Sequence, residues 1–283
     1  MTDTLRQQDL RAHIESDVAR ALTEDNWAGD LTGMLVPPER SARATIISRE
    51  DARLCGSAWV ERAVMRLDPE ARVTWAAADG DRIAENQSVC LIEGNARAIL
   101  AAERTALNFL QLLSGIATRT ARYVEAVAGT STRIYDTRKT LPGLRHAQRY
   151  AVRMGGGYNH RFGLSDAILI KENHIAAAGG IGAAMRDAHR YAASASFLQI
   201  EVETLSELNE ALQHGARLIL LDNMPVHEMR EAVRMAAGRA ELEISGGVTL
   251  ETVRGMAEVG IQRISIGNLT KQILPVDYSM RIS

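Results

Sequence analysis

The sequence predicts an α/β protein, with an N-terminal part of helices and antiparallel strands followed by a (β/α) barrel. Three observations support this. From residue 130 on, six short apolar runs each end in a polar or glycine-rich corner, with helical segments between them. Between residues 41 and 97 the pattern is short and alternating, and an apolar helical stretch at 97–127 separates the two patterns. Repeated strand-then-helix units form parallel sheets, whereas alternation with tight turns is typical of antiparallel strands.

The N-terminal part begins with an amphipathic helix over 5–24, where apolar residues recur at steps of three and four. Alternating runs at 42–50, 72–83 and 88–94, with turns at Asp79-Gly80 and Gly94-Asn95, predict antiparallel strands, with a helix at 58–67 between them. This half has few clustered polar residues, which indicates a scaffold or a partner-facing domain. In the long helix that follows, Arg104 lies among Leu and Ala beside Glu103. A buried arginine needs an anionic partner, so Arg104 is expected either to pair with an acid or to contact a ligand.

The six apolar runs of the second half end at residues spaced by 35, 30, 21, 23 and 22 positions: Asp136, Lys171, Glu201, Asp222, Ser245 and Gly267. Only six or seven strand-helix units fit, so the barrel is expected to have fewer than eight strands. In such barrels the active site lies at the carboxyl ends of the strands. The six corner residues are therefore predicted to converge on one mouth.

Positive charge is concentrated near this predicted mouth. Residues 133–174 hold eight Lys and Arg against three acids, in a chain whose formal net charge is −2. Such focused charge suits a small, multiply anionic ligand and argues against a nucleic-acid partner, which three Phe and three Trp also disfavour. Cations that follow strand ends or glycines are the best candidates for ligand contacts: Arg138, Lys139, Arg161 and Lys171. Arg145, Arg149 and Arg153 recur every four residues, which indicates a solvated helix face.

Two further groups complete the predicted site. Ser245-Gly246-Gly247 and Gly267-Asn268 are nearly free of side chains, which suits backbone N–H contacts to a phosphate, although tight turns would also need these glycines. Glu201 and Asp222 supply carboxylates for ribose hydroxyls or for Mg²⁺ held through water, unless they are strand-end charges without function.

The remaining features exclude several classes of protein. There is no Ser/His/Asp set and no His pair with metal spacing, and Cys55 and Cys90 suit two reduced thiols. No apolar run reaches the roughly 18 residues that span a bilayer, so no membrane association is expected. The polar start resembles no targeting signal, which favours the cytoplasm. Three functions remain: a Schiff-base lyase using Lys171, phosphoribosyl transfer to an anionic acceptor, and a non-catalytic anion-binding module. The excess of Arg over Lys favours recognition of several carboxylates and phosphates.

Several motifs carry a family resemblance: Glu-Arg-Thr-Ala-Leu-Asn at 103–108, Asp-Thr-Arg-Lys-Thr at 136–140, Pro-Gly-Leu-Arg at 142–145, Gly-Gly-Gly at 155–157, Asn-His-Arg at 159–161, Leu-Ile-Lys-Glu-Asn-His at 169–174, Glu-Val-Glu at 201–203 and Leu-Asp-Asn at 221–223. Together they resemble the quinolinate phosphoribosyltransferases, also called nicotinate-nucleotide pyrophosphorylases (carboxylating). A paralogue associated with molybdate transport shares part of the Thr-Arg-Lys motif. The 159–161 and 170–174 segments resemble the enzyme more.

The resemblance implies that phosphoribosyl pyrophosphate and quinolinate give nicotinate mononucleotide, pyrophosphate and CO₂, with Mg²⁺, in de novo NAD biosynthesis. It implies an open α/β sandwich over 1–115, with the tail at about 272–283 packing back on it, and an incomplete seven-stranded (β/α) barrel over 116–271. It also implies a homodimer in which Arg104 reaches across the interface. The alternatives are the Lys171 lyase and a paralogous non-catalytic anion-binding protein.

The resemblance implies four catalytic residues: Lys139, Lys171, Glu201 and Asp222. It implies that the same four also bind substrate, together with Arg104, Thr137, Arg138, His160, Arg161, Ser245, Gly246, Gly247, Gly267, Asn268 and Lys271. Glu201 and Asp222 are also the implied Mg²⁺ ligands, through water. Two positions depart from the family pattern. Asn268 stands where a small residue is usual, and Lys271 stands where some members have His.

Overall fold

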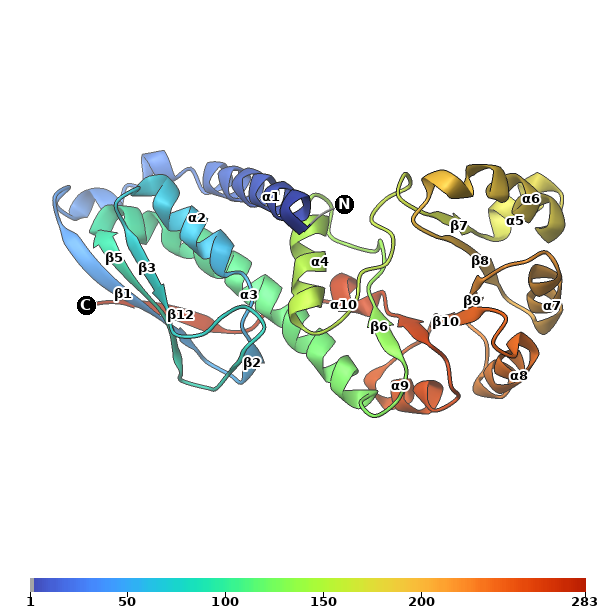
Figure 1. Cartoon of the computed structure of the whole chain (residues 1–283). Coiled ribbons are helices and arrows are strands. Elements are labelled where there is room, and N and C mark those ends of the chain that lie inside the picture. The colour runs from blue at the N-terminus through green and yellow to red at the C-terminus, as the bar shows by residue number, and fades with distance from the viewer. Residues whose placement is uncertain (1–2) are drawn as a thin grey trace. The chain divides into compact units, whose positions relative to one another are not determined.

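The computed structural model describes residues 3–283, with side chains from Leu10 onward. The chain forms two compact units (Figure 1). The first comprises the residues up to Ala121 together with Thr140–Gly156 and Thr270–Ser283, and the second comprises Arg122–Lys139 and Gly157–Leu269. Within the described residues no helix is both long enough and apolar enough to span a membrane.

The first unit is built on a four-stranded antiparallel sheet of order β12-β1-β5-β3. Its strands are β1 (Ser41–Ser48), β3 (Arg72–Trp75), β5 (Ser88–Asn95) and β12 (Tyr278–Ile282), and a separate pair joins β2 (Ala52–Arg53) to β4 (Arg82–Ile83). In β1 the buried positions alternate at Ala44, Ile46 and Ser48, so one face of the sheet packs on the core. The C-terminal strand β12 pairs antiparallel with β1, as the red and blue ribbons show in Figure 1.

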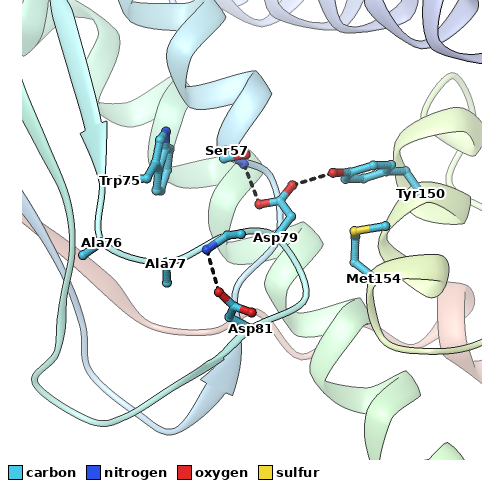
Figure 2. A pocket seen from close by; sticks show the side chains of 9 residues that line it. Ser57, Trp75, Ala76, Ala77, Asp79, Asp81, Tyr150 and Met154 are labelled. Atoms are coloured by element: carbon cyan, nitrogen blue, oxygen red, sulfur yellow. Dashed lines mark hydrogen bonds between the residues drawn. The ribbon is translucent and has the colours of Figure 1, made fainter. Parts of the chain in front are cut away.

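The helices of the first unit are α1 (Asp3–Glu24), α2 (Ser57–Leu67), the larger part of α3 (Ala96–Ala126) and α4 (Arg145–Met154), with short 3₁₀ turns η1 (Trp27–Gly29) and η2 (Gly33–Leu35). Asp79 ties two of them together (Figure 2). Its carboxylate accepts the N–H groups of Gly56 and Ser57 at the start of α2, each at 3.1 Å, and the Tyr150 hydroxyl of α4 at 2.8 Å. The exposed N–H groups of α2 are thus satisfied from a loop elsewhere in the sequence.

The C-terminal tail crosses α3 at Gly115. Val276 N–H donates to Gln111 O at 3.1 Å, and the Tyr278 hydroxyl donates to Ser114 Oγ at 3.0 Å. A Cβ on Gly115 would lie 2.2 Å from the carbonyl oxygen of Leu274. Glycine is therefore required at position 115 because two backbones touch there.

Gly155 ends α4 where that helix meets α3. It has a helical φ of −77° and is buried, and an added Cβ would lie 2.5 Å from Ala117 O. The glycine therefore allows α4 to approach α3 closely. On α4 itself Arg153 is exposed, but Arg149 is buried, so the expected solvated face does not extend to Arg149.

The second unit is a parallel sheet of order β6-β11-β10-β9-β8-β7. Its strands are β6 (Arg133–Tyr135), β7 (Ile168–Ile170), β8 (Leu198–Val202), β9 (Leu218–Asp222), β10 (Glu241–Ser245) and β11 (Arg263–Ser265). An isolated parallel bridge between Tyr135 and Tyr158 adds a seventh strand position beside β6. The predicted fold class, an antiparallel-sheet unit with an incomplete barrel, is confirmed.

Helices follow the strands as the sequence predicts: α5 (Glu172–Ala178), α6 (Ile181–Tyr191) with η3 (Ala192–Ser194), α7 (Leu205–Gln213), α8 (Val226–Ala236), α9 (Leu250–Ala257) and the short α10 (Asn268–Lys271). Figure 1 shows α6, α7 and α8 one after another along the outside of the strands. Thr204 caps α7 by accepting Glu207 N–H, and the Glu207 side chain accepts Thr204 N–H in return. The helices cover the outer face and leave the carboxyl ends of the strands to the loops.

We predict that Gly115→Ala lowers the free energy of unfolding by about 1–3 kcal/mol, because the added methyl group pushes the tail off α3. Urea denaturation would measure the change. The control is Gly255→Ala, an exposed position in α9 where an added Cβ meets no atom within 4 Å. That control should leave stability unchanged or raise it by about 0.5–1 kcal/mol. Equal losses of unfolding free energy in both variants would contradict the close contact between the tail and α3 at Gly115.

Candidate functional site

The carboxyl ends of the barrel strands bring the six predicted corner residues to one edge. Glu201 lies in β8, and Asp222 and Ser245 end β9 and β10. The other three follow directly after β6, β7 and, one residue later, β11: Asp136, Lys171 and Gly267. Because all six strands are parallel neighbours, this edge is a single mouth, as the sequence predicts.

Asp136 anchors one side of this mouth. It is fully buried, and its carboxylate accepts His160 N–H at 2.8 Å and the Asn159 side-chain amide at 2.5 Å. Its own N–H donates to Tyr158 O at 3.0 Å. All these bonds go to protein, so Asp136 fixes the segment that carries Arg161 against the end of β6.

Arg138 and Arg161 supply the positive charge of the mouth. Burial lowers the pKa of Arg161, and the charge of Arg138 lowers it further, while Asp166 and Glu201 oppose the shift. Arg161 Nη1 also donates to Ala167 O at 3.4 Å. Two guanidinium groups that repel each other in a partly buried place are stabilised when an anion lies between them. This arrangement therefore fits a ligand with carboxylate groups.

Lys171 forms an ion pair with Glu201, whose side chain is 12% exposed. Lys171 is also the N-cap residue that precedes α5, and its N–H donates to His174 Nδ1 at 3.0 Å. A Schiff-base lyase needs an uncommitted, unprotonated amine. The ion pair therefore favours an electrostatic role for Lys171 over a nucleophilic one.

The glycine corners lie at the ends of β10 and β11. Gly246 and Gly247 have φ values of +90° and +61°, and a Cβ on Gly246 would lie 2.0 Å from Asn223 Oδ1. A Cβ on Gly267 would lie 3.1 Å from Lys139 Cδ. The glycines thus permit both an unusual backbone and a close approach by neighbouring side chains. Nearby, Thr137 Oγ1 accepts Lys139 N–H at 3.1 Å.

Two predicted site residues belong to the other unit. Arg104 lies on α3 and Lys271 ends α10, both in the first unit, whereas Asn268 at the start of α10 belongs to the second. Arg104 is exposed, which corrects the expectation that it is buried among the apolar residues of its helix. It shares the exposed side of α3 with Leu100 and Asn108, at spacings of four residues.

Sequence reasoning missed a polar set inside the barrel. Gln199 and Glu243 are fully buried, and Arg263 is nearly so. Gln199 Nε2 donates to Glu243 Oε2 at 3.1 Å, and Arg263 Nε lies 3.1 Å from the same oxygen. Burial raises the pKa of Glu243, but His160 and Arg263 more than offset it, so the net pKa lies below the ordinary value. The one sequence signal for this buried set was the presence of polar residues within or beside short apolar runs.

An open hollow in the first unit is a poor fit for the predicted ligand (Figure 2). Ser57, Trp75, Tyr150 and Met154 contribute to its lining, and its charged groups are the carboxylates of Asp79 and Asp81. Asp81 accepts Ala78 N–H at 2.8 Å, and Asp79 holds the start of α2. A negatively charged hollow repels the anions that the barrel mouth suits.

Comparison with known proteins agrees with this geometry. The profile of the quinolinate phosphoribosyl transferase C-terminal domain matches residues 116–281, and the profile of the N-terminal domain matches residues 30–114. The chain belongs to the quinolinate phosphoribosyltransferase family. The resemblance noted in the motifs is thereby confirmed.

Similar members of the quinolinate phosphoribosyltransferase family come from bacteria and plants. The chain is 39% identical to the probable nicotinate-nucleotide pyrophosphorylase [carboxylating] of Bacillus subtilis, covering 92% of this chain and 90% of that protein. It is 37% identical to the mitochondrial quinolinate phosphoribosyltransferase [decarboxylating] 2a of Nicotiana tabacum, covering 93% and 80%. The solved nicotinate-nucleotide pyrophosphorylase of Francisella tularensis superposes with a TM-score of 0.93 at 40% identity, over 96% and 97% of the two chains.

Proposed function

We propose that the barrel mouth binds quinolinate and phosphoribosyl pyrophosphate and joins them. As a member of its family the chain is a decarboxylating quinolinate phosphoribosyltransferase, a pentosyltransferase that produces nicotinate mononucleotide for de novo NAD biosynthesis. One observation carries the assignment of the mouth: the bonds of Asp136 to the segment 159–161 bring Arg138 and the buried Arg161 to the edge where Glu201 and Asp222 lie near the ends of β8 and β9. The proposed domain bounds are 1–115, with the tail at about 272–283, for the sandwich and 116–271 for the barrel.

Arg138 and Arg161 are the proposed partners of the quinolinate carboxylates. Quinolinate carries two adjacent carboxylates on a planar ring, and guanidinium groups bind carboxylates through two parallel N–H contacts. Such contacts would offset the repulsion between the two arginines and fix the ring nitrogen toward the ribose carbon. Lys171, paired with Glu201 in this structure, stands beside them as a further cation.

The glycine corners are the proposed phosphate site. Backbone N–H groups at Gly246, Gly247 and Gly267 would hold the 5′-phosphate, with Ser245 and Asn268 at the edges of the same loops. Lys139, close to Gly267, would neutralise the pyrophosphate. Thr137 would keep Lys139 in place through its hydrogen bond to the Lys139 N–H. Lys271 remains a proposed phosphate contact.

Glu201 and Asp222 are the proposed magnesium ligands, through water. They lie at the carboxyl ends of the neighbouring strands β8 and β9. The described residues contain no cluster of three or more His, Cys, Asp or Glu that could enclose a metal. Two carboxylates of this kind fit Mg²⁺, which keeps several waters and binds largely through substrate phosphates. When bound, Mg²⁺ would neutralise charge on the pyrophosphate.

The proposed mechanism begins as pyrophosphate departs and Lys139 stabilises its growing charge. The ribose C1′ gains oxocarbenium character, which the carboxylates of Glu201 or Asp222 stabilise through the ribose hydroxyls. The quinolinate ring nitrogen, oriented by Arg138 and Arg161, then forms the new bond to C1′. As CO₂ leaves, the pyridinium charge stabilises the electron pair left on C2, and exclusion of water favours this loss because opposite charges cancel. C2 then takes up a proton from solvent, which gives nicotinate mononucleotide.

A homodimer is the proposed assembly, with Arg104 contributed to the partner's site. The support is a set of exposed apolar side chains: Trp27, Leu31, Met34 and Leu35 in the segment before β1, and Leu100 on α3. Arg97 Nε donates to Val36 O at 2.6 Å and holds the segment before β1 against α3. Arg104 lies one turn beyond Leu100 on the exposed side of α3. Exposed apolar side chains of this kind suit an interface between subunits.

The cytoplasm is the proposed compartment. Cys55 and Cys90, the two cysteines of the chain, are buried free thiols. Burial, with a smaller effect of Glu61, raises the pKa of Cys90 to about 12. Unpaired thiols suit a reducing compartment, although buried thiols resist oxidation wherever they are.

We predict that Arg138→Ala and Arg161→Ala each raise the quinolinate KM and lower kcat, because each removes roughly 2 to 5 kcal/mol of transition-state binding. Steady-state kinetics with both substrates would measure this. Arg217→Ala is the control, since Arg217 is exposed at the opposite end of β9. Unchanged kinetics in both test variants would disprove the assignment of the mouth.

We further predict that Gly246→Ala weakens binding of phosphoribosyl pyrophosphate by about tenfold, because a left-handed backbone disfavours a Cβ and the methyl group meets Asn223. Isothermal titration calorimetry in Mg²⁺ would measure the affinity. Gly260→Ala, with a similar φ of +94° but open space around the added Cβ and a position before β11, is the control. Equal weakening of phosphoribosyl pyrophosphate binding in both variants would show that backbone strain at positive φ is responsible, and it would contradict a specific phosphate site at Gly246.

A further inference from the structure

The buried polar set of the barrel connects to the mouth through His160. The ring is almost fully buried. Its Nε2 lies 2.9 Å from Gln199 Oε1 and 3.4 Å from Glu243 Oε1. Its Nδ1 lies 2.8 Å from the backbone nitrogen of Arg161. Both ring nitrogens are therefore engaged by the protein itself.

These contacts determine which nitrogen carries the proton. The backbone N–H of Arg161 can only donate, so Nδ1 must accept. In the neutral ring the proton then lies on Nε2, which donates to Gln199 Oε1 with the Glu243 carboxylate beside it. The imidazole thus acts as a strut between the barrel interior and the backbone of Arg161.

The carboxylate at the inner end of this strut is itself held on two sides. Gln199 donates to Glu243 Oε2, and Arg263 pairs with the same oxygen while stacking on the Tyr135 ring, 4.1 Å from its centroid. Gln199 therefore accepts from His160 with one end of its amide and donates to Glu243 with the other. Rotation of the His160 or Gln199 side chain would leave a buried polar group without its hydrogen bond.

Packing alone does not require this polar set. Leu220 on β9 is paired in register with Glu243, so the two side chains lie on the same face of the sheet, and Leu220 is buried as well. Apolar residues of similar volume are commonly as stable as a buried ion pair, or more stable. Hydrogen bonds between buried polar and charged groups fix the orientation of each side chain, which an apolar core does not do.

We propose that Glu243 is a positioning residue for quinolinate binding: with Gln199 it holds the His160 imidazole, which in turn holds the Arg161 backbone beside Arg138. This inference rests on the proposed function of the mouth. It gives His160 a positioning role in place of the direct substrate contact that the family resemblance implies. Glu243, Gln199 and Arg263 do not touch the substrate and act through His160 and Arg161.

Kinetics of three variants test the proposal. Glu243→Gln keeps an acceptor but loses the charge, Glu243→Leu loses both, and Gln199→Leu removes the acceptor of His160. We expect the quinolinate KM to rise by about tenfold or more in the two leucine variants and by less in Glu243→Gln, with the KM of phosphoribosyl pyrophosphate changed less than about twofold. If Glu243→Leu does not fold, the other two variants carry the test.

Thr132→Val is the matched control. Thr132 is buried before the start of β6 and donates to Ile261 O at 2.6 Å, so its loss removes a buried hydrogen bond away from the mouth. It should lower the melting temperature without changing the quinolinate KM. Unchanged quinolinate KM in folded Glu243→Leu and Gln199→Leu would overturn the proposal, as would an equal rise in Thr132→Val.

A spectroscopic measurement separates this proposal from the function on which it rests. In ¹⁵N-histidine protein, long-range proton–nitrogen correlation spectra should show His160 as the Nε2–H tautomer in the wild type and as a mixture in Gln199→Leu. An Nδ1–H tautomer in the wild type would overturn the proposal even if the enzyme is active. Absence of product from wild-type protein with a correct His160 tautomer would refute the function and leave the strut in place.

Discussion

The buried carboxylate of Asp136 is the interaction on which the rest of the barrel mouth depends. It joins the end of β6 to the segment 159–161 by accepting two hydrogen bonds from that segment. Arg138 follows Asp136 by two residues, and Arg161 follows the bonded His160 by one. One buried acid therefore brings together two arginines from separate parts of the chain. In the proposed function an anionic substrate between the two arginines would offset their mutual repulsion.

Charges of both signs line this site. Arg138 and Arg161 lie beside Asp136, whereas Lys171 pairs with Glu201 of β8, and Asp222 ends the neighbouring strand β9. A substrate pair made of a dicarboxylate and a magnesium diphosphate ester needs both kinds of surface. Phosphoribosyl transfer depends mainly on positioning and on charge stabilisation, and side chains held by strand ends supply both with little reorganisation.

Much of this could be predicted from the sequence, since strand ends recur at regular steps and their polar residues must meet at one edge of a parallel sheet. The inner set could not be predicted. Gln199 and Glu243 each stand between two apolar neighbours, whereas Arg263 follows Gln262, and their partners come from strands whose register is not visible in a sequence. The exposure of Arg104 could not be predicted either. A helix that is apolar around most of its circumference does not show which of its sides the neighbouring elements cover.

The central claim is tested most directly by one assay of purified protein with quinolinate, phosphoribosyl pyrophosphate and Mg²⁺, in which nicotinate mononucleotide and CO₂ are followed together. Nicotinate, which lacks the 2-carboxylate, serves as the parallel acceptor. The account predicts equal yields of both products from quinolinate and no product from nicotinate. Product from nicotinate, or nicotinate mononucleotide without matching CO₂, would contradict it.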